Sequence, residues 1–221
     1  MSAHEQALLA QCPQPTLILP QSEIVVMVPQ DWPAKWHAEA GIHDLDGLSS
    51  WLNAAYVHMR QWTGVDPNQN HYRRTGERNR LAFAATGKGD FVFRGEARPY
   101  VGLRNGRDPL FGSEDWVGWL CHELSHDFFH DQHFNVGRTE WGEGMCDYSR
   151  YHLLRELGLK VAAENWEKVL LNGSPRDKYK GPAKLLLLWE RNQRLSGPAA
   201  LWRRIRKTDF DLTVGRSSWN I

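Results

Sequence analysis

The chain has 221 residues and a formal net charge of +1, and hydrophobic residues make up 41% of it. This length is enough for one substantial core, or for two lobes of one folded unit with a cleft between them. The balanced charge gives no field that would attract nucleic acid or an anionic membrane, so neither is expected as a partner. The sequence contains no apolar run of about 18 residues, so no membrane span is expected.

Three cysteines are too few for a disulfide framework, and their spacing resembles no zinc finger. Cys121 and Cys146 are expected to be buried free thiols, with a contact between them as the alternative. The first 20 residues lack the basic segment and the continuous apolar stretch of a signal peptide. We therefore expect a soluble protein, in the cytoplasm or exported by a route without a cleavable signal, or with its signal already removed. The sequence leaves its oligomeric state open.

Residues 1–14 are polar and are expected to form a flexible N-terminus. Residues 15–221 are expected to form a single domain with an N-terminal lobe over about 15–132 and a C-terminal lobe over about 133–221. Within the first lobe, β-branched residues predict short strands over 16–20 and 23–28.

Between residues 44 and 63 apolar side chains recur at intervals of three and four, which predicts a helix that ends at Gly64. His58 on this helix is expected to be half-buried, without a ligand role. Further strands are predicted over 81–85, 90–94 and 98–103, in a hairpin or meander. The arginines at 73, 74, 78 and 80 are expected to lie in a solvated loop.

Ser113 is a good N-cap for a helix that runs to about residue 130 and contains an H-E-x-x-H motif. Residues four apart lie on one face of a helix, about 6 Å apart along its axis, so His122 and His126 can hold one ion. Glu123 projects beside the ion without having to bind it, where a carboxylate can take a proton from an activated water. The motif predicts one Zn²⁺ per chain with Glu123 as the general base.

A second helical pattern begins at residue 140 and supplies the third ligand. A catalytic zinc needs three protein ligands and one open position, and two histidines with a carboxylate form a standard set. Glu143 is the expected ligand, and Asp147 follows on the same face, where it can accept the free ring N–H of a zinc-bound histidine. Glu140 is the alternative, but it lacks an acidic partner at i+4 and precedes Gly142, which is expected to form a turn.

The segments 122–126 and 141–148, H-E-L-S-H and W-G-E-G-M-C-D-Y, resemble the motifs of the gluzincin zinc metallopeptidases. The second segment is similar to that of the aminopeptidase branch and of basic secretory proteins. Two departures are that sixteen residues separate His126 from Glu143, slightly fewer than usual, and that Cys146 replaces a small alanine. The resemblance covers about residues 114–155. It implies an α+β, zincin-like fold, with a small twisted sheet and helices in the N-terminal lobe and a mainly helical C-terminal lobe.

The same resemblance implies hydrolysis of peptide bonds in a peptide or protein substrate. The G-x-M-E-N segment with which aminopeptidases hold a free N-terminus is not found before His122, so an endopeptidase is expected. The strand that precedes the metal helix implies substrate contacts at Tyr100, Val101 and Gly102. His133, in the loop after that helix, is a further candidate for substrate contact.

Tyr179 precedes Lys180-Gly181 at the start of a predicted helix, in a segment that resembles the one that supplies the catalytic tyrosine of the aminopeptidase branch. Its hydroxyl would donate to the oxyanion that forms on the scissile carbonyl. The alternative is a loop tyrosine that packs under Trp189, in which case Tyr148 or Tyr151 would take the role.

Further helices are predicted over 161–171, over 184–190 and from 199 to 205, followed by a tail from residue 208. Two other functions fit the same motifs. One is a non-catalytic zincin-like binding module for a protein or glycan partner, which the presence of Glu123 disfavours because zinc binding alone does not require this residue. The other is hydrolysis of a non-peptide amide or ester, which uses the same metal chemistry.

Overall fold

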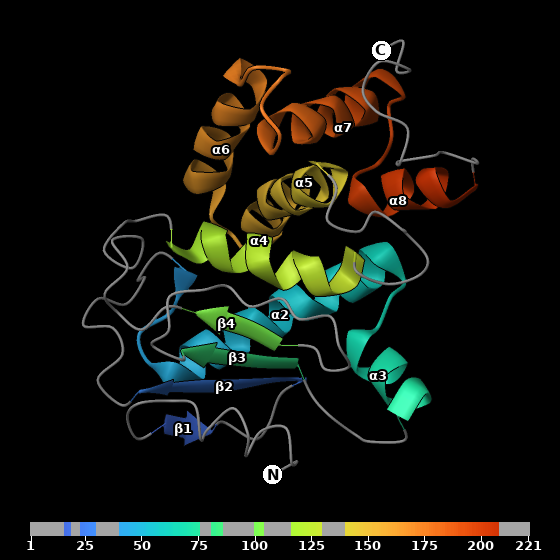
Figure 1. Ribbon diagram of the computed structural model, residues 1–221. Coiled ribbons are helices and arrows are strands. Elements are labelled where there is room, and N and C mark those ends of the chain that lie inside the picture. Colours follow the sequence, from blue (N-terminus) through green and yellow to red (C-terminus); the bar gives the residue numbers. More distant parts are fainter. Residues whose placement is uncertain are drawn as a thin grey trace. The chain divides into compact units, whose positions relative to one another are not determined.

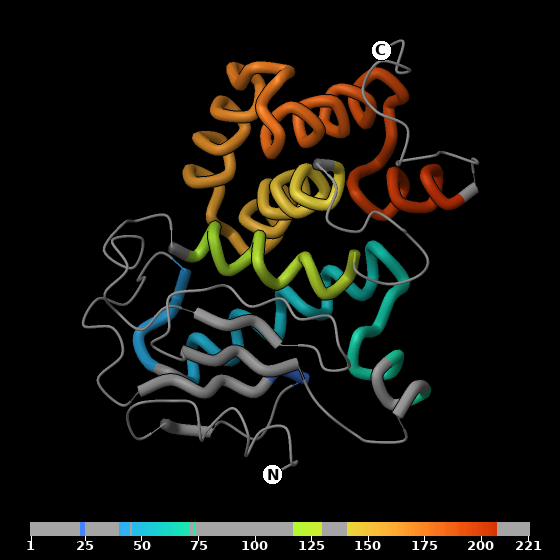
Figure 2. Tube along the Cα trace, viewed as in Figure 1, coloured from blue at the N-terminus to red at the C-terminus, as the bar shows by residue number. Residues whose placement is uncertain are grey.

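The computed structural model describes residues 16–18, 23–29, 40–75, 81–85, 100–103, 116–129 and 140–207. Figure 2 shows in colour the residues that are described with their side chains. The chain divides into two compact units, and each is described by itself. Unit 1 consists of Met1–Tyr56 and Asp66–Val117, and unit 2 of Val57–Val65 and Gly118–Ile221. Four predicted features lie outside the described residues: the flexible N-terminus, the strand over 90–94, the N-cap Ser113 and the tail from residue 208.

The described part of unit 1 contains four short strands, in the order β1-β2-β3-β4 (Figure 1). They are β1 (Thr16–Ile18), β2 (Ile24–Pro29), β3 (Leu81–Ala85) and β4 (Tyr100–Leu103), close to the strands predicted from β-branched residues. β1 is antiparallel to β2, whereas β2 with β3 and β3 with β4 are parallel pairs. The direct parallel pairing of β3 with β4 shows that the predicted hairpin or meander is wrong, because neighbouring strands in either arrangement are antiparallel.

Helix α2 (Leu45–Thr63) ends as predicted at Gly64, which has a φ of +65°. Helix α3 (Pro67–Thr75) follows, so the loop predicted for its arginines is wrong at Arg73 and Arg74. The backbone N–H of Gln69 donates to Oδ1 of Asp66 at 3.1 Å, which caps the helix, and proline is well suited to its first position. The same Asp66 oxygen accepts the hydroxyl of Tyr56 at 2.8 Å, so α3 is tied to the part of α2 in unit 1.

The described part of unit 2 is helical. After the end of α2 it contains α4 (Trp116–Phe129, from Gly118 onward), α5 (Glu140–Glu156), α6 (Lys160–Asn172), α7 (Lys180–Asn192) and α8 (Pro198–Lys207). The helices predicted over 161–171, 184–190 and 199–205 are confirmed. Helix α5 begins at Glu140 and continues through Gly142, so the turn predicted there is wrong.

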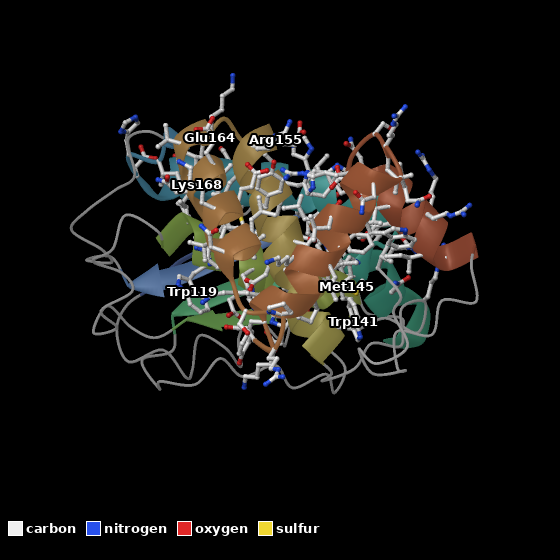
Figure 3. The ribbon with its side chains drawn as sticks, turned by 90° about the horizontal axis from the view of Figure 1, so that it is seen from above. Trp119, Trp141, Met145, Arg155, Glu164 and Lys168 are labelled. Carbon is white, nitrogen blue, oxygen red and sulfur yellow. The ribbon has the colours of Figure 1, made fainter. Side chains whose placement is uncertain are left out.

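Helix α5 lies among the other helices of unit 2 (Figure 1). A Cβ atom on Gly144 would clash with the side chain of Pro182 and lie 2.9 Å from the backbone nitrogen of Ala183. Glycine therefore lets the start of α7 approach α5 closely. In Figure 3 the buried side chains of Trp141 and Met145 mark one end of α5, and Arg155 marks the other. Unit 2 is thus built around the helix that carries the predicted third ligand.

Of the residues described with their side chains, 79% are helical. The strands of unit 1 are backbone segments of three to six residues. The α+β, zincin-like class expected from the sequence is therefore wrong, and the part of the chain that the structure describes is mainly helical. Over the part of the chain that the structure describes, no helix combines the length and the apolar character needed to cross a membrane.

Candidate metal centre

His122 and His126 lie one turn apart on α4, and their ring centroids are 5.0 Å apart. Leu120, Leu124 and Phe128, spaced four residues apart, are buried and fix which face of this helix points into unit 2. His122 is itself only 3% exposed, whereas the side chain of His126 is 12% exposed. The two rings therefore lie together, with His126 nearer to solvent.

Asp147 on α5 contacts the inner nitrogen of His122. The Nδ1–H group of His122 donates to Oδ1 of Asp147 at 2.7 Å, and both residues are buried. The backbone carbonyl of Asp147 accepts the indole N–H of Trp166 on α6 at 3.1 Å. A carboxylate on one ring nitrogen fixes the orientation of an imidazole and leaves its other nitrogen for a ligand. The structure thus brings Asp147 to the ring atom that its predicted role requires.

Glu143 contacts the outer nitrogens of both histidines. Its Oε2 atom lies 3.2 Å from Nε2 of His122 and 3.6 Å from Nε2 of His126. Given metal–ligand bonds of about 2.0–2.3 Å, two ligands of a tetrahedral zinc ion lie about 3.3–3.6 Å apart. The two distances from Glu143 therefore match the spacing between ligands of one zinc ion. The side chain of Glu143 is 31% exposed, so solvent reaches this side of the site.

Cys146 is a second donor from α5. Among the described residues, His122, His126 and Cys146 each offer a ligand atom within 4.8 Å of the others. Cys146 is fully buried, and among the described residues neither Cys146 nor Cys121 forms a disulfide. Oε2 of Glu143 lies 3.2 and 3.6 Å from the Nε2 atoms of the histidines, and Glu143 stays the predicted third ligand. The sequence analysis missed Cys146 as a donor, although its i+3 spacing from Glu143 was the signal.

Glu123 is 5% exposed beside this cluster. Burial raises the pKa of Glu123, the positive charge of His122 opposes that rise, and the resulting pKa is about 7. Nearby carboxylates at Glu143 and Asp147 add to the rise. A carboxyl group with a pKa near 7 can both accept and release a proton at neutral pH, as general acid–base catalysis requires.

The carboxylates next to His122 change its pKa. Burial lowers the pKa of this ring, but hydrogen bonds with Asp147 and Glu143 outweigh burial and raise the pKa to about 10. For Glu143, burial raises the pKa, but the hydrogen bond from His122 and the charges of His126 and His122 together outweigh burial and lower the pKa. At neutral pH an imidazolium therefore faces two carboxylates, and a metal cation would replace its proton, because histidine binds a metal in its neutral form.

A buried arginine, which the sequence analysis did not single out, lies behind His122. Arg150 is 2% exposed, and its guanidinium carbon lies 3.6 Å from the ring centroid of Trp166 and 5.8 Å from that of Trp119. Trp119, labelled on α4 in Figure 3, lies 5.7 Å from the ring of His122. Cation–π contacts of this kind join α4, α5 and α6 next to the Asp147–His122 pair.

Tyr179 is the N-cap residue of α7 and is 37% exposed. Its backbone N–H donates to Oδ1 of Asp177 at 2.9 Å, and Nζ of Lys178 lies 4.7 Å from its ring centroid. Because α7 starts against Gly144, the segment after Tyr179 lies next to the helix that carries Glu143. The role of Tyr179 remains a prediction.

The other tyrosines considered for that role have partners elsewhere. The hydroxyl of Tyr148 donates to Glu190 at 2.6 Å, and that of Tyr151 donates to Glu167 at 3.4 Å. Both acceptors lie on neighbouring helices of unit 2 rather than among the predicted ligands. These contacts favour Tyr179 over the two alternatives.

The predicted substrate contacts Tyr100, Val101 and Gly102 lie in β4 of unit 1, and their role stays a prediction. His133 lies outside the described residues. The alternative ligand Glu140 is the first residue of α5, and its side chain is not described.

Comparison with known proteins finds no protein-family model, no curated protein and no solved structure that matches this chain.

Proposed function

We propose that the protein is a zinc-dependent metallopeptidase that cleaves within peptide chains. The observation that carries this proposal is the convergence of His122 and His126 on one carboxylate oxygen of Glu143, at 3.2 and 3.6 Å. Support also comes from Asp147, which orients His122, and from the resemblance of both motif segments to those of the gluzincins. The three converging side chains would hold one Zn²⁺ per chain.

When bound, zinc supplies a Lewis acid that polarises the scissile carbonyl and lowers the pKa of a water toward about 7. Glu123 would accept the proton from that water and pass it to the leaving amine. The pKa of Glu123, about 7, is close to the value that suits both accepting and releasing this proton at neutral pH. A cation beside Glu123 favours the carboxylate form, which is the form that accepts a proton.

The negative charge that develops on the carbonyl oxygen needs a donor in addition to the metal. We assign this role to Tyr179, whose exposed ring at the start of α7 is accessible to a substrate. A tyrosine hydroxyl donates at neutral pH, and the N-cap position fixes the backbone from which it projects.

The test is a cleavage screen with a peptide library, using zinc-loaded wild type and Glu123→Gln. Glutamine cannot accept the proton, so turnover should fall by about 10²- to 10⁴-fold while the zinc content stays at one per chain. Glu164→Gln is the matched control, because Glu164 is an exposed carboxylate on α6, outside the site, and its loss should leave turnover unchanged.

Equal turnover in wild type and Glu123→Gln would remove the hydrolase assignment. Zinc binding without cleavage of any peptide would leave the non-catalytic binding module or hydrolysis of another substrate class. A parallel screen with ester and non-peptide amide substrates separates those two outcomes.

A further inference from the structure

Cys146 is a metal-ligating side chain that the proposed mechanism does not use. It lies three residues after Glu143 and one before Asp147, so all three belong to one side of α5. Its sulfur and one nitrogen from each of His122 and His126 lie within 4.8 Å of one another. A lone buried cysteine is usually a small apolar side chain, but this one meets two histidines that are themselves candidate ligands.

We propose that Cys146 is a further ligand of the metal ion, so that the site has two nitrogen donors, one oxygen donor and one sulfur donor, and the water of the proposed mechanism would be a fifth ligand, as catalytic zinc sites can become five-coordinate. This inference rests on the metal site of the proposed function and adds a donor to it. Glu143 contributes from the side that solvent reaches, and Cys146 from the buried side, since their side chains are 31% and 0% exposed.

The sulfur of Cys146 and the two histidine nitrogens need only a small adjustment to bind one ion. Zinc–sulfur and zinc–nitrogen bonds of about 2.3 and 2.0–2.1 Å place ligand atoms about 3.6 Å apart, within the 4.8 Å that encloses the three atoms of the metal-free site. When the metal–sulfur bond forms, the thiol proton passes to solvent. The site then contains a thiolate, which is a soft donor.

A soft donor changes which ion the site prefers. Thiolate and imidazole favour zinc and related borderline or soft cations, whereas carboxylates and water suit magnesium, calcium and manganese. A site of two histidines and a glutamate alone would discriminate less between these two groups of cations. The ligand class that this site selects is therefore a borderline or soft divalent cation, of which zinc is the common cellular example.

The first experiment looks for the metal–sulfur bond in the full chain. X-ray absorption of the zinc-loaded protein should show one sulfur at about 2.3 Å in addition to nitrogen and oxygen at about 2.0–2.2 Å. The cobalt-substituted protein should show a near-ultraviolet thiolate-to-cobalt charge-transfer band. That band should vanish in Cys146→Ala and persist in the matched controls Cys121→Ser and Cys12→Ser.

The second experiment is a double-mutant cycle on zinc affinity with Cys146→Ala, Glu143→Ala and the double variant. Each single variant keeps three donors, and the double variant keeps two. The affinity lost in the double variant should therefore exceed the product of the two single losses by roughly 2- to 150-fold. Circular dichroism shows whether each variant folds. If a variant does not fold, the X-ray absorption of the wild-type protein still tests for the metal–sulfur bond.

Each outcome decides one of the two proposals. Zinc bound without sulfur in its shell, or a double variant no weaker than Glu143→Ala, overturns the role of Cys146 and leaves the three-ligand site intact. Absence of zinc from folded wild type in excess metal overturns the proposed function itself.

Discussion

Two histidine–carboxylate pairs lie on different faces of α5, and their surroundings differ. On one face His122 donates to Asp147 at 2.7 Å, and on another His152 donates to Glu190 at 2.9 Å. Both histidines are 3% exposed. Burial and a carboxylate partner are thus common to the two pairs, and neither feature alone marks a functional site.

What differs is the set of groups around each ring. Tyr148 donates to the same oxygen of Glu190 as His152 does, at 2.6 Å. The rings of Trp62, Tyr148 and Tyr151 lie 4.7 to 6.2 Å from that of His152, so aromatic packing surrounds it. We call His152, Glu190 and these aromatic side chains the packed pair.

His122 faces other groups that can bind a metal. Its outer nitrogen faces Glu143 at 3.2 Å, and His126 and Cys146 complete a group of donors around it. His122 and His152 therefore differ in the groups that surround the second ring nitrogen, and among the described residues only that of His122 faces further side chains able to bind a metal. The carboxylate on its first nitrogen orients the ring in both pairs.

The largest expected effect is a difference in kcat between two variants that each lose a tyrosine hydroxyl. Tyr179→Phe should lower kcat by about 10²- to 10³-fold, because it removes a donor to the developing oxyanion, and should leave the zinc content unchanged. Tyr148→Phe should leave kcat unchanged and destabilise the fold by about 1.5–3 kcal/mol, because its hydroxyl donates to the charged Glu190. Steady-state kinetics and denaturant unfolding of both variants check this. An unchanged kcat in Tyr179→Phe would move the oxyanion role to another residue.

A smaller effect, on zinc affinity, is expected when the carboxylates of Asp147 and Glu190 are removed. Asp147→Ala should weaken zinc binding by roughly 10- to 100-fold, since Asp147 acts through the orientation of His122. Glu190→Ala should leave zinc affinity unchanged, because Glu190 pairs with His152, outside the donor group. Chelator competition on both variants measures the difference, and equal losses of affinity would contradict the distinction between the pairs.

The smallest effect concerns stability in acid. Burial raises the pKa of Glu190, but hydrogen bonds from His152 and Tyr148 outweigh it, so the folded pKa lies below the ordinary value of 4.5. A lowered carboxyl pKa stabilises the fold above the ordinary pKa, and this stabilisation is lost as the pH falls through the folded pKa.

Glu190→Gln removes that titration. The variant should be less stable than wild type at pH 7, by about the 0.5–1.5 kcal/mol of a typical hydrogen bond, and the gap should narrow as the pH falls below 4.5. Urea unfolding at a series of pH values measures this. A gap that is constant or widens in acid would contradict the assignment.

The parts of the site that the sequence predicts are those that depend on local spacing. His122 and His126 lie one turn apart on any helix, and the same holds for Glu143 and Asp147, so two helical motifs are enough to expect a cluster. Gly64 ends α2 because glycine adopts positive φ readily. Helix α3 was missed although Asp66-Pro67 is itself a start signal.

The rest depends on contacts between distant segments. The predicted strands form close to the expected bounds, but their local patterns did not show that β3 pairs directly and in parallel with β4, nor that helices dominate the fold. Cys146 was noted only as a departure from alanine, because its closeness to the histidines depends on how α4 packs on α5. Whether Tyr100 meets a substrate depends on long-range placement in the same way.

The central claim is that the donor group around His122 binds one zinc ion and that the packed pair does not. Zinc titration against a chromophoric chelator tests it directly, on wild type, His122→Ala and His152→Ala that are folded by circular dichroism. The account predicts about one tight site per chain in wild type and in His152→Ala, and loss of that site in His122→Ala. Equal zinc affinity of wild type and His122→Ala would contradict it.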